Sequence, residues 1–261
     1  MRSLSIGATG MLAQQTNVDV ISNNIANMNT TGFKRGRAEF NDLLYQDLRR
    51  VGSASSDTGT IVPSGVQIGL GVRTAAVYRI HEQGNLEITD NSLDLAVNGR
   101  GYFQVEQPNG ETAYTRAGSF QLSPDGDIVT PDGFMVEPGI NIPAESTAIS
   151  INENGEVWVK LDGQVAPQQV GQLELAVFPN DAGLEAMGQN LFVETPASGA
   201  PQVAAPGEEG FGSMVQGALE TSNVDAVQEI TNLITAQRAY EMNSKSIQAS
   251  DEMLRSVTQL R

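Results

Sequence analysis

The sequence contains no cysteine and only one histidine, His81, among its 261 residues. Without cysteine the chain has no disulfide, no thiolate metal site and no cysteine nucleophile. A single histidine excludes a His-rich zinc site and the usual Ser-His-Asp triad. Aromatic residues make up only 5% of the chain, so a large aromatic ligand pocket is not expected. These shortages remove several common classes of enzyme.

Long apolar runs are also missing. No stretch approaches the ~20 consecutive apolar residues of a membrane-spanning helix. The first twenty residues have no continuous apolar segment, because polar Gln14, Gln15 and Asn17 interrupt it. We therefore expect neither a membrane span nor a cleaved secretory signal.

The net charge of −16 is distributed unevenly along the chain. Residues 1–50 carry six basic and four acidic side chains, and residues 211–261 carry four basic and six acidic ones. Residues 51–210 carry five basic and twenty-one acidic side chains. Such an acidic middle argues against a nucleic-acid partner and favours a solvated body that repels its own copies. The nearly neutral ends are suited to packing together.

Both ends of the chain show apolar residues at helical spacing. Seven-residue steps recur near each terminus, and such a stripe needs a partner helix to cover it. We expect helices over 3–28 and 223–260. They lie within an N-terminal helical segment bounded at 1–30 and a C-terminal helical segment bounded at 211–261. The two helices are expected to pair as a coiled coil. The predicted subunit-packing residues are Leu4, Met11, Val18, Ile21, Ile25, Leu219, Ile230, Leu233, Tyr240, Ile247 and Leu254.

The middle of the chain has the pattern of short antiparallel strands. Period-two segments alternate with Asn-Gly and Asp-Gly pairs, which are hairpin turn signals. A connecting segment with extended and loop structure is expected over 31–80, including a Ser/Gly-rich stretch at 52–60. An outward β domain is expected over 81–210. The predicted fold class is α+β, with a small antiparallel barrel or sandwich between the terminal helices.

No chemical motif in the sequence is complete. The acidic turns around Asn154 and Asp125 lack the ligand spacing of an EF-hand, and hairpin turns explain them. The many carboxylates allow a glycosidase pair in principle, but sequence gives no spacing test. The basic run Lys34, Arg35 and Arg37 fits either contact with an anion or acidic partner, or a solvated turn. His81 is interpreted as structural and Trp158 as a core residue, and no metal or cofactor is expected.

Two terminal segments and several internal blocks resemble one protein family. SNNIANMNTTGFKR at 22–35 and SNVDAVQEITNLITAQRAYEMNSKSIQASDEML at 222–254 resemble the end signatures of bacterial flagellar rod and hook axial proteins. Internal blocks, among them AYTRAGSFQLSPDGDIV, resemble the distal-rod branch of that family. The resemblance covers nearly the whole chain. The small residues Ser5, Ile6 and Gly7 depart from the bulkier start expected of this family.

The resemblance implies a self-assembling structural subunit without catalysis, in a tube that transmits torque from motor to hook. It implies a helical homo-oligomer in the basal body, with the terminal helices inside and the β domain outside. Implied partners are the proximal rod proteins, the hook protein, the peptidoglycan-layer and outer-membrane ring proteins, and the flagellar type III export apparatus. Alternatives are another rod or hook subunit, or a β-domain hydrolase or binding module presented on a coiled coil.

Overall fold

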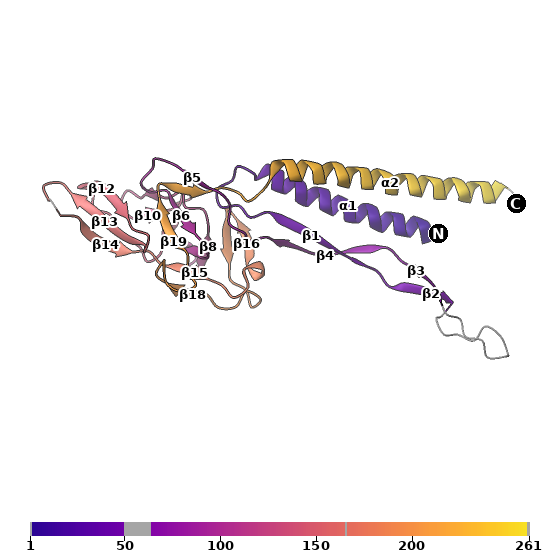
Figure 1. The fold of residues 1–261 in the computed structure, drawn as a ribbon, viewed down its shortest axis with the longest axis horizontal. Helices are drawn as coiled ribbons and strands as arrows, with labels where there is room; N and C mark the ends of the chain where they lie inside the picture. The colour runs from indigo at the N-terminus through magenta and orange to yellow at the C-terminus, as the bar shows by residue number, and fades with distance from the viewer. Residues whose placement is uncertain (1, 50–63, 165, 260–261) are drawn as a thin grey trace. The chain divides into compact units, whose positions relative to one another are not determined.

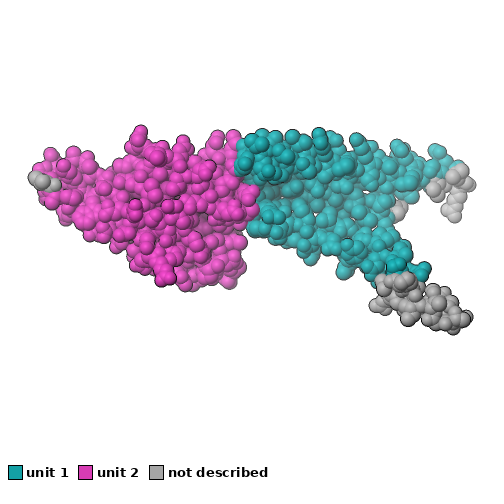
Figure 2. Space-filling model, in the orientation of Figure 1, with its two compact units in different colours: residues 1–25, 36–78, 225–261 teal, residues 26–35, 79–224 magenta. Residues whose placement is uncertain are grey.

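The computed structural model describes residues 2–49, 64–164 and 166–259, and these divide into two compact units. Residues 1–25, 36–78 and 225–261 form the first, here called the helix unit. Residues 26–35 and 79–224 form the second, here called the β unit. Figure 2 colours the two units separately. The Ser/Gly-rich stretch 52–60 predicted as a linker lies outside the described residues.

The helix unit combines two long helices with a narrow β ribbon (Figure 1). Its helices are α1 (Arg2–Ala26) and α2 (Ala226–Gln259), which lie side by side. The ribbon pairs β1 (Gly36–Asp42) with β4 (Val72–Arg79), and β2 (Tyr45–Arg49) with β3 (Val66–Gly69). The prediction of two terminal helices is thus confirmed at the level of secondary structure.

Local sequence explains where the helices begin and end. Asp225 caps α2, because its Oδ1 accepts hydrogen bonds from the backbone N–H groups of Val227 and Gln228. After α1 the chain turns through residues 27–32, and Gly32 has a φ of +68°, which favours glycine. The prediction that helix extends back to 211 and includes Leu219 is wrong. Leu219 lies in a strand, because residues 213–216 and 218–220 form two strands of the β unit, which pair with the strands at 95–98 and 86–88.

The β unit is built from short antiparallel strands. Its largest sheet has nine strands in the order β16-β17-β8-β7-β11-β10-β9, with β15 pairing with both β7 and β18. A second sheet contains β12, β13 and β14. Two further pairs join β19 to β6 and β20 to β5. The strand bounds are β5 (Leu86–Ile88), β6 (Leu95–Asn98), β7 (Tyr102–Glu106), β8 (Thr112–Thr115), β9 (Gln121–Leu122), β10 (Ile128–Val129), β11 (Met135–Val136), β12 (Ser146–Ile151), β13 (Glu156–Leu161), β14 (Gln168–Gln172), β15 (Leu175–Val177), β16 (Glu185–Gly188), β17 (Leu191–Val193), β18 (Gln202–Ala204), β19 (Ser213–Gln216) and β20 (Ala218–Glu220), and a short 3₁₀ turn, η1, spans Asp181–Gly183.

The sheets share one apolar core. Phe103 of β7 and Phe120 pack edge to face with ring centroids 5.0 Å apart. Val157 and Val159 of β13 and Met214 of β19 reach the same cluster, so the three sheets that supply it are held together by burial. A smaller cluster of Tyr102, Tyr114, Ala176, Phe178 and Phe192 packs against Leu184, the residue that follows η1.

The turns of the β unit agree with those predicted from the sequence, but the predicted closed barrel is not found in the described residues. The glycines of the six Asn-Gly and Asp-Gly pairs all have positive φ, between 78° and 113°. The expected barrel is absent from the described residues, because β16 and β9 end the path of the large sheet without pairing with each other. Trp158 is half-buried rather than core. Its indole N–H donates to Glu156, while Val157 and Val159 on either side of it are fully buried.

Candidate functional site

The α1–α2 contact in the helix unit is close and antiparallel. A Cβ placed on Gly7 would lie 2.7 Å from Ile247 Cγ1, and one on Gly10 would lie 2.9 Å from Asn243 Nδ2. At the other end of α1, Asn24 meets Glu229. As residue numbers increase along α1, the residue numbers of the facing positions on α2 decrease, so the two helices run antiparallel. Glycine at positions 7 and 10 lets the two backbones approach, which a larger side chain would prevent.

One buried amide joins three elements of the helix unit. Asn24 is only 2% exposed, and its Nδ2 donates to Glu229 Oε2 at 3.1 Å and to the Gly36 carbonyl at 2.9 Å. Its Oδ1 accepts from the Gly36 N–H at 2.8 Å. Because a buried amide is costly unless it is fully bonded, these contacts fix α1, α2 and the start of β1 relative to one another.

The predicted packing residues are unequally covered in the single chain. Ile21 is buried, whereas Ile230, Tyr240 and Leu254 remain 50%, 44% and 38% exposed. The others are half-buried: Leu4, Met11, Val18, Ile25, Leu233 and Ile247 on the helices, and Leu219 in β20. Their role in contacts between subunits stays a prediction.

The most buried positions of α2 were missed because they are small or polar. Glu229, Ala236 and Ser250 are each at most 5% exposed, and Asn243 contacts Gly10. These four residues fall seven apart, as do Leu233, Tyr240, Ile247 and Leu254. Together they form alternating three- and four-residue steps. A search for seven-residue spacing among small and polar side chains would have found them.

Apolar side chains on the outer side of α2 have no cover in the single chain. Val227, Ile230 and Ile234 are 76%, 50% and 46% exposed, and Met242 and Met253 are exposed further along. Their three- and four-residue steps place the first three on one face of the helix. Soluble monomers rarely expose such a continuous apolar patch. This outer stripe (Val227, Ile230, Ile234, Met242 and Met253) is therefore the candidate assembly surface.

The β ribbon shows the same property. Leu44, Tyr45, Leu48 and Val66 are between 48% and 83% exposed on and next to β2 and β3. A groove of about 430 Å³ runs between α1 and β4, lined by residues that include Leu12 and Val72. In the described residues, exposed apolar side chains are thus concentrated in the helix unit.

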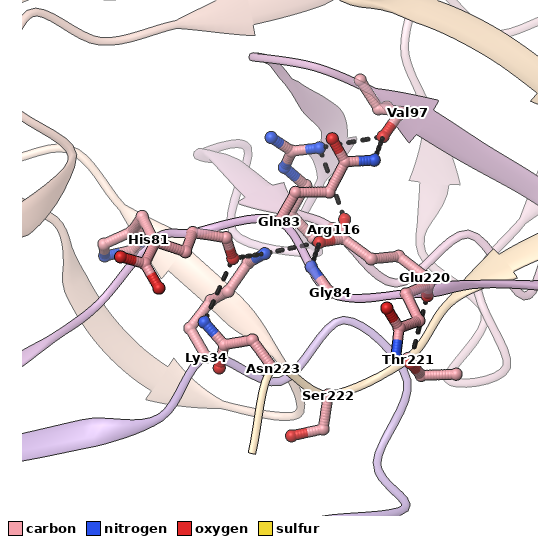
Figure 3. Close-up of polar contacts among 12 residues, drawn as sticks. Lys34, His81, Gln83, Gly84, Val97, Arg116, Glu220, Thr221, Ser222 and Asn223 are labelled. Carbon is pink, nitrogen blue, oxygen red and sulfur yellow. Dashed lines mark hydrogen bonds and ion pairs between the residues drawn. The ribbon is translucent and has the colours of Figure 1, made fainter. Parts of the chain in front are cut away.

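A buried ion cluster organises the β unit where the chain leaves α1 and approaches α2 (Figure 3). The Lys34 and Glu220 side chains are both fully buried, with Nζ and Oε1 2.5 Å apart. Lys34 also donates to the Glu82 carbonyl at 2.7 Å. Glu220 Oε2 lies 3.3 Å from Arg116 Nη1, and its Oε1 accepts from the Gly84 N–H. Four segments distant in sequence meet at this one carboxylate.

Burial sets the electrostatics of that cluster. Desolvation lowers the pKa of Lys34, and the nearby Glu220 carboxylate offsets part of this effect. Neither sequence reading holds for Lys34, which is neither a solvated turn residue nor an exposed anion contact. Arg35 pairs loosely with Glu82 at 3.7 Å, and Arg37 is exposed on β1. No sequence signal separates the buried lysine from its two basic neighbours.

His81 lies near the same cluster as a neutral residue. Its Nδ1 is 2.7 Å from the Tyr102 hydroxyl, and its ring contacts Phe192 edge to face. Burial, followed by the charges of Lys34, Arg79 and Arg116, lowers the pKa of His81 to about 4. A structural histidine was predicted, but its cationic surroundings were not.

The described residues contain no group of three or more His, Asp and Glu side chains that could hold a metal ion. Among the helices that the structure describes, none is long and apolar enough to cross a membrane. The candidate functional features are therefore the apolar surface of the helix unit and the buried cluster of the β unit.

Comparisons with known proteins match three parts of the chain to one group of families. Residues 4–34 match the family described as flagella basal body rod protein. Residues 96–159 match the flagellar hook protein FlgE/F/G D1 domain, and residues 215–260 match the flagellar basal body rod FlgEFG protein C-terminal family. These matches include α1, much of the β unit and α2.

Whole-chain relatives agree with these matches. The chain is 62% identical to the flagellar basal-body rod protein FlgG of Caulobacter vibrioides, with all of both chains covered. It is 56% identical to the protein of the same name from Agrobacterium fabrum, over 97% of each chain. It is 40% identical to that of Bacillus subtilis, over 100% of this chain and 99% of the other.

Proposed function

Because this chain belongs to the flagellar basal-body rod protein family, we propose that it is a structural subunit of the flagellar distal rod. The observation that carries the proposal is identity of 62% with a rod protein over the whole length of both chains. The place of action is the basal body. The function of the protein is mechanical: it transmits torque, and this requires no catalytic group.

We further propose that many copies assemble into a helical tube with the helix unit as its inner wall. Support comes from the outer stripe of α2 and from exposed Leu44 and Tyr45 of the β ribbon, which no other described residue of the chain covers. In this proposal α1 and α2 of one subunit form a coiled-coil pair, and the stripe packs against a neighbouring subunit. The acidic β unit faces outward, where its charge keeps bodies apart.

The proposed partners follow from this place in the flagellum. They are the proximal rod proteins at one end, the hook protein at the other, and the peptidoglycan-layer and outer-membrane ring proteins around the rod. Delivery through the flagellar type III export apparatus is part of the same proposal. The absence of cysteine fits a chain that travels unfolded without forming disulfides.

The test replaces the chromosomal copy with a tagged Leu233→Asp variant and examines isolated basal bodies by electron microscopy. We expect truncated rods and no swimming, because a charge at a half-buried helix position disrupts the packed wall. Val203→Asp is the matched control, since Val203 is a 44% exposed apolar residue of the β unit. Normal rods in the Leu233 variant would exclude the proposed wall. Muramidase activity of the purified protein would instead favour the hydrolase alternative.

A further inference from the structure

A small polar pocket in the β unit has the features of an anion site. Its volume is about 210 Å³, and its lining includes His81, Gln83, Arg100, Tyr102, Arg116 and Asp181. This is smaller than the ~300–1,000 Å³ of pockets for drug-sized ligands. In a chain with a net charge of −16, two arginines in one pocket are unusual.

Arg116 is the deepest charged residue of this pocket. It is 5% exposed, and its Nη1 and Nη2 are held by Glu220 Oε2 and the Gly99 carbonyl. Its Nε is buried and has no hydrogen-bond partner. Because Nη1 also donates to the Val97 carbonyl, the second N–H of Nη2 is the donor of this guanidinium that is left for a ligand in the pocket.

The other side of the pocket also offers donors. Burial raises the pKa of Tyr102, so its hydroxyl stays protonated, and it lies 2.7 Å from His81 Nδ1. A neutral imidazole carries one N–H, and where Tyr102 donates to Nδ1 that N–H is on Nε2. Arg100 is 61% exposed at the pocket and pairs loosely with Asp181 at 3.6 Å. Asp181 is the one carboxylate among the lining residues.

We propose that this pocket binds one carboxylate group, either of a small free carboxylate or of an Asp or Glu side chain from another chain. Arg116 and Arg100 both line the pocket, and arginine is the side chain best suited to pairing with a carboxylate. The pocket selects a single negative charge over a phosphate dianion, because Asp181 repels the additional charge. The group lies beside His81 and competes with Asp181 for Arg100.

The test uses the full chain labelled with ¹⁵N-histidine, because His81 is its one histidine and gives a single imidazole signal. Sodium acetate is added at neutral pH to about 50 mM, with chloride replacing acetate in the control so that screening is constant. We expect a saturable shift of the Nε2 resonance with acetate and a weaker one with phosphate.

Three variants make the result specific. Arg100→Gln should weaken acetate binding by about fivefold or more, and Asp181→Asn should strengthen it by a similar factor, since each changes one charge at the site. Arg73→Gln, the same substitution at an exposed residue of the helix unit, should change nothing. A stronger affinity in Asp181→Asn is not expected from a merely structural effect. Identical shifts in all three variants, or tighter binding of phosphate, would overturn the proposal.

Diluting the protein in the absence of acetate distinguishes the two possible sources of the carboxylate, a free small molecule and another chain. If the His81 resonance moves with protein concentration, and less so in Arg100→Gln, the group comes from another copy of the chain. If it does not move but acetate shifts it, the ligand is a free carboxylate. The proposal fails if neither acetate nor protein concentration shifts the signal.

Discussion

Gly7 of α1 lies directly against Ile247 of α2, with room for no further carbon between them. A Cβ on Gly7 would approach Ile247 Cγ1 to 2.7 Å, a distance at which the Ile247 side chain or one of the helices has to move. The contact explains why the chain keeps a residue with poor helix propensity inside α1.

Gly7→Ala is therefore expected to loosen the helix unit. Overpacking costs about 1–3 kcal/mol, more than the ~1 kcal/mol that alanine gains over glycine in a helix. Hydrogen exchange of α1 and α2 in the assembled protein measures the effect, since both helices are expected to exchange fast in the dilute monomer. The double variant Gly7→Ala, Ile247→Ala should recover part of the loss, because it removes the clashing carbon. Equal exchange in the wild type and Gly7→Ala would mean that the helices do not meet in solution as described.

Ile234→Asp tests the outer stripe without disturbing the subunit. Ile234 is 46% exposed, so the substitution should change the unfolding free energy of the monomer by less than about 0.5 kcal/mol. Assembly should nevertheless be lost, since the charge would be buried against a neighbour. Sedimentation of concentrated protein measures assembly, and Gln248→Asp at another exposed helix position is the control. Polymer formation by the Ile234 variant at the wild-type concentration contradicts the assignment of this face.

Glu220→Gln is predicted to be among the most destabilising polar substitutions in the β unit. It leaves Lys34 buried beside Arg116 without a compensating charge, which costs about 3–5 kcal/mol. Lys34→Met should cost less, because Glu220 keeps Arg116 as a partner. Urea unfolding followed through Trp158 fluorescence gives both values. The double variant should lose less than the two single losses together, and strict additivity would argue against a coupled cluster.

His81 makes the β unit less stable in mild acid. Its pKa is about 4 in the fold against about 6.5 in an unfolded chain, so the unfolded state takes up a proton first as pH falls. The contribution of neutral His81 to the unfolding free energy is complete above pH ~6.5. It is lost as the pH falls from there through about 4, and the total loss is about 3 kcal/mol. Comparing the urea midpoints of the wild type and His81→Gln over this pH range separates the contribution of His81 from that of the carboxylates. Parallel pH profiles would show that His81 is not buried as a neutral ring.

Hydrogen exchange on the dilute monomer tests how much of the helix unit is stable alone. We expect fast exchange over 1–30 and 225–261 and slow exchange in the β unit, whose apolar core is far larger. The exposed stripe of α2 leaves that helix with cover on one side only. Protection of α2 equal to that of β7 at low concentration would contradict this expectation.

The sequence predicted the secondary-structure elements better than it predicted which of them pair or pack together. Asn-Gly and Asp-Gly pairs mark real turns, but the turn at Gln189 and Asn190 was missed, because both residues adopt positive φ without glycine. The order of the nine-stranded sheet was not predicted, since pairing between strands distant in sequence leaves no local signal. The same reason hides Lys34, whose acceptor Glu220 is 186 residues away.

The heptad analysis named only apolar positions. It included Leu233 and Ile247 and left out Glu229 and Asn243, which have equivalent spacing. Leu219 was included because it continues the seven-residue count, although its neighbours Ala218 and Glu220 are buried in β20. Spacing alone does not show where a helix begins, and Asp225 provides that information through its cap.

The division into units has a consequence for the order of events. The chain passes between the helix unit and the β unit four times, after residues 25, 35, 78 and 224. No continuous fragment contains the whole helix unit, whereas a chain ending at residue 224 already has every residue of the β unit. A growing or emerging chain thus completes the β unit first. In the proposed assembly, the outer stripe of α2 is added with the final stretch, so association would wait until the chain is complete.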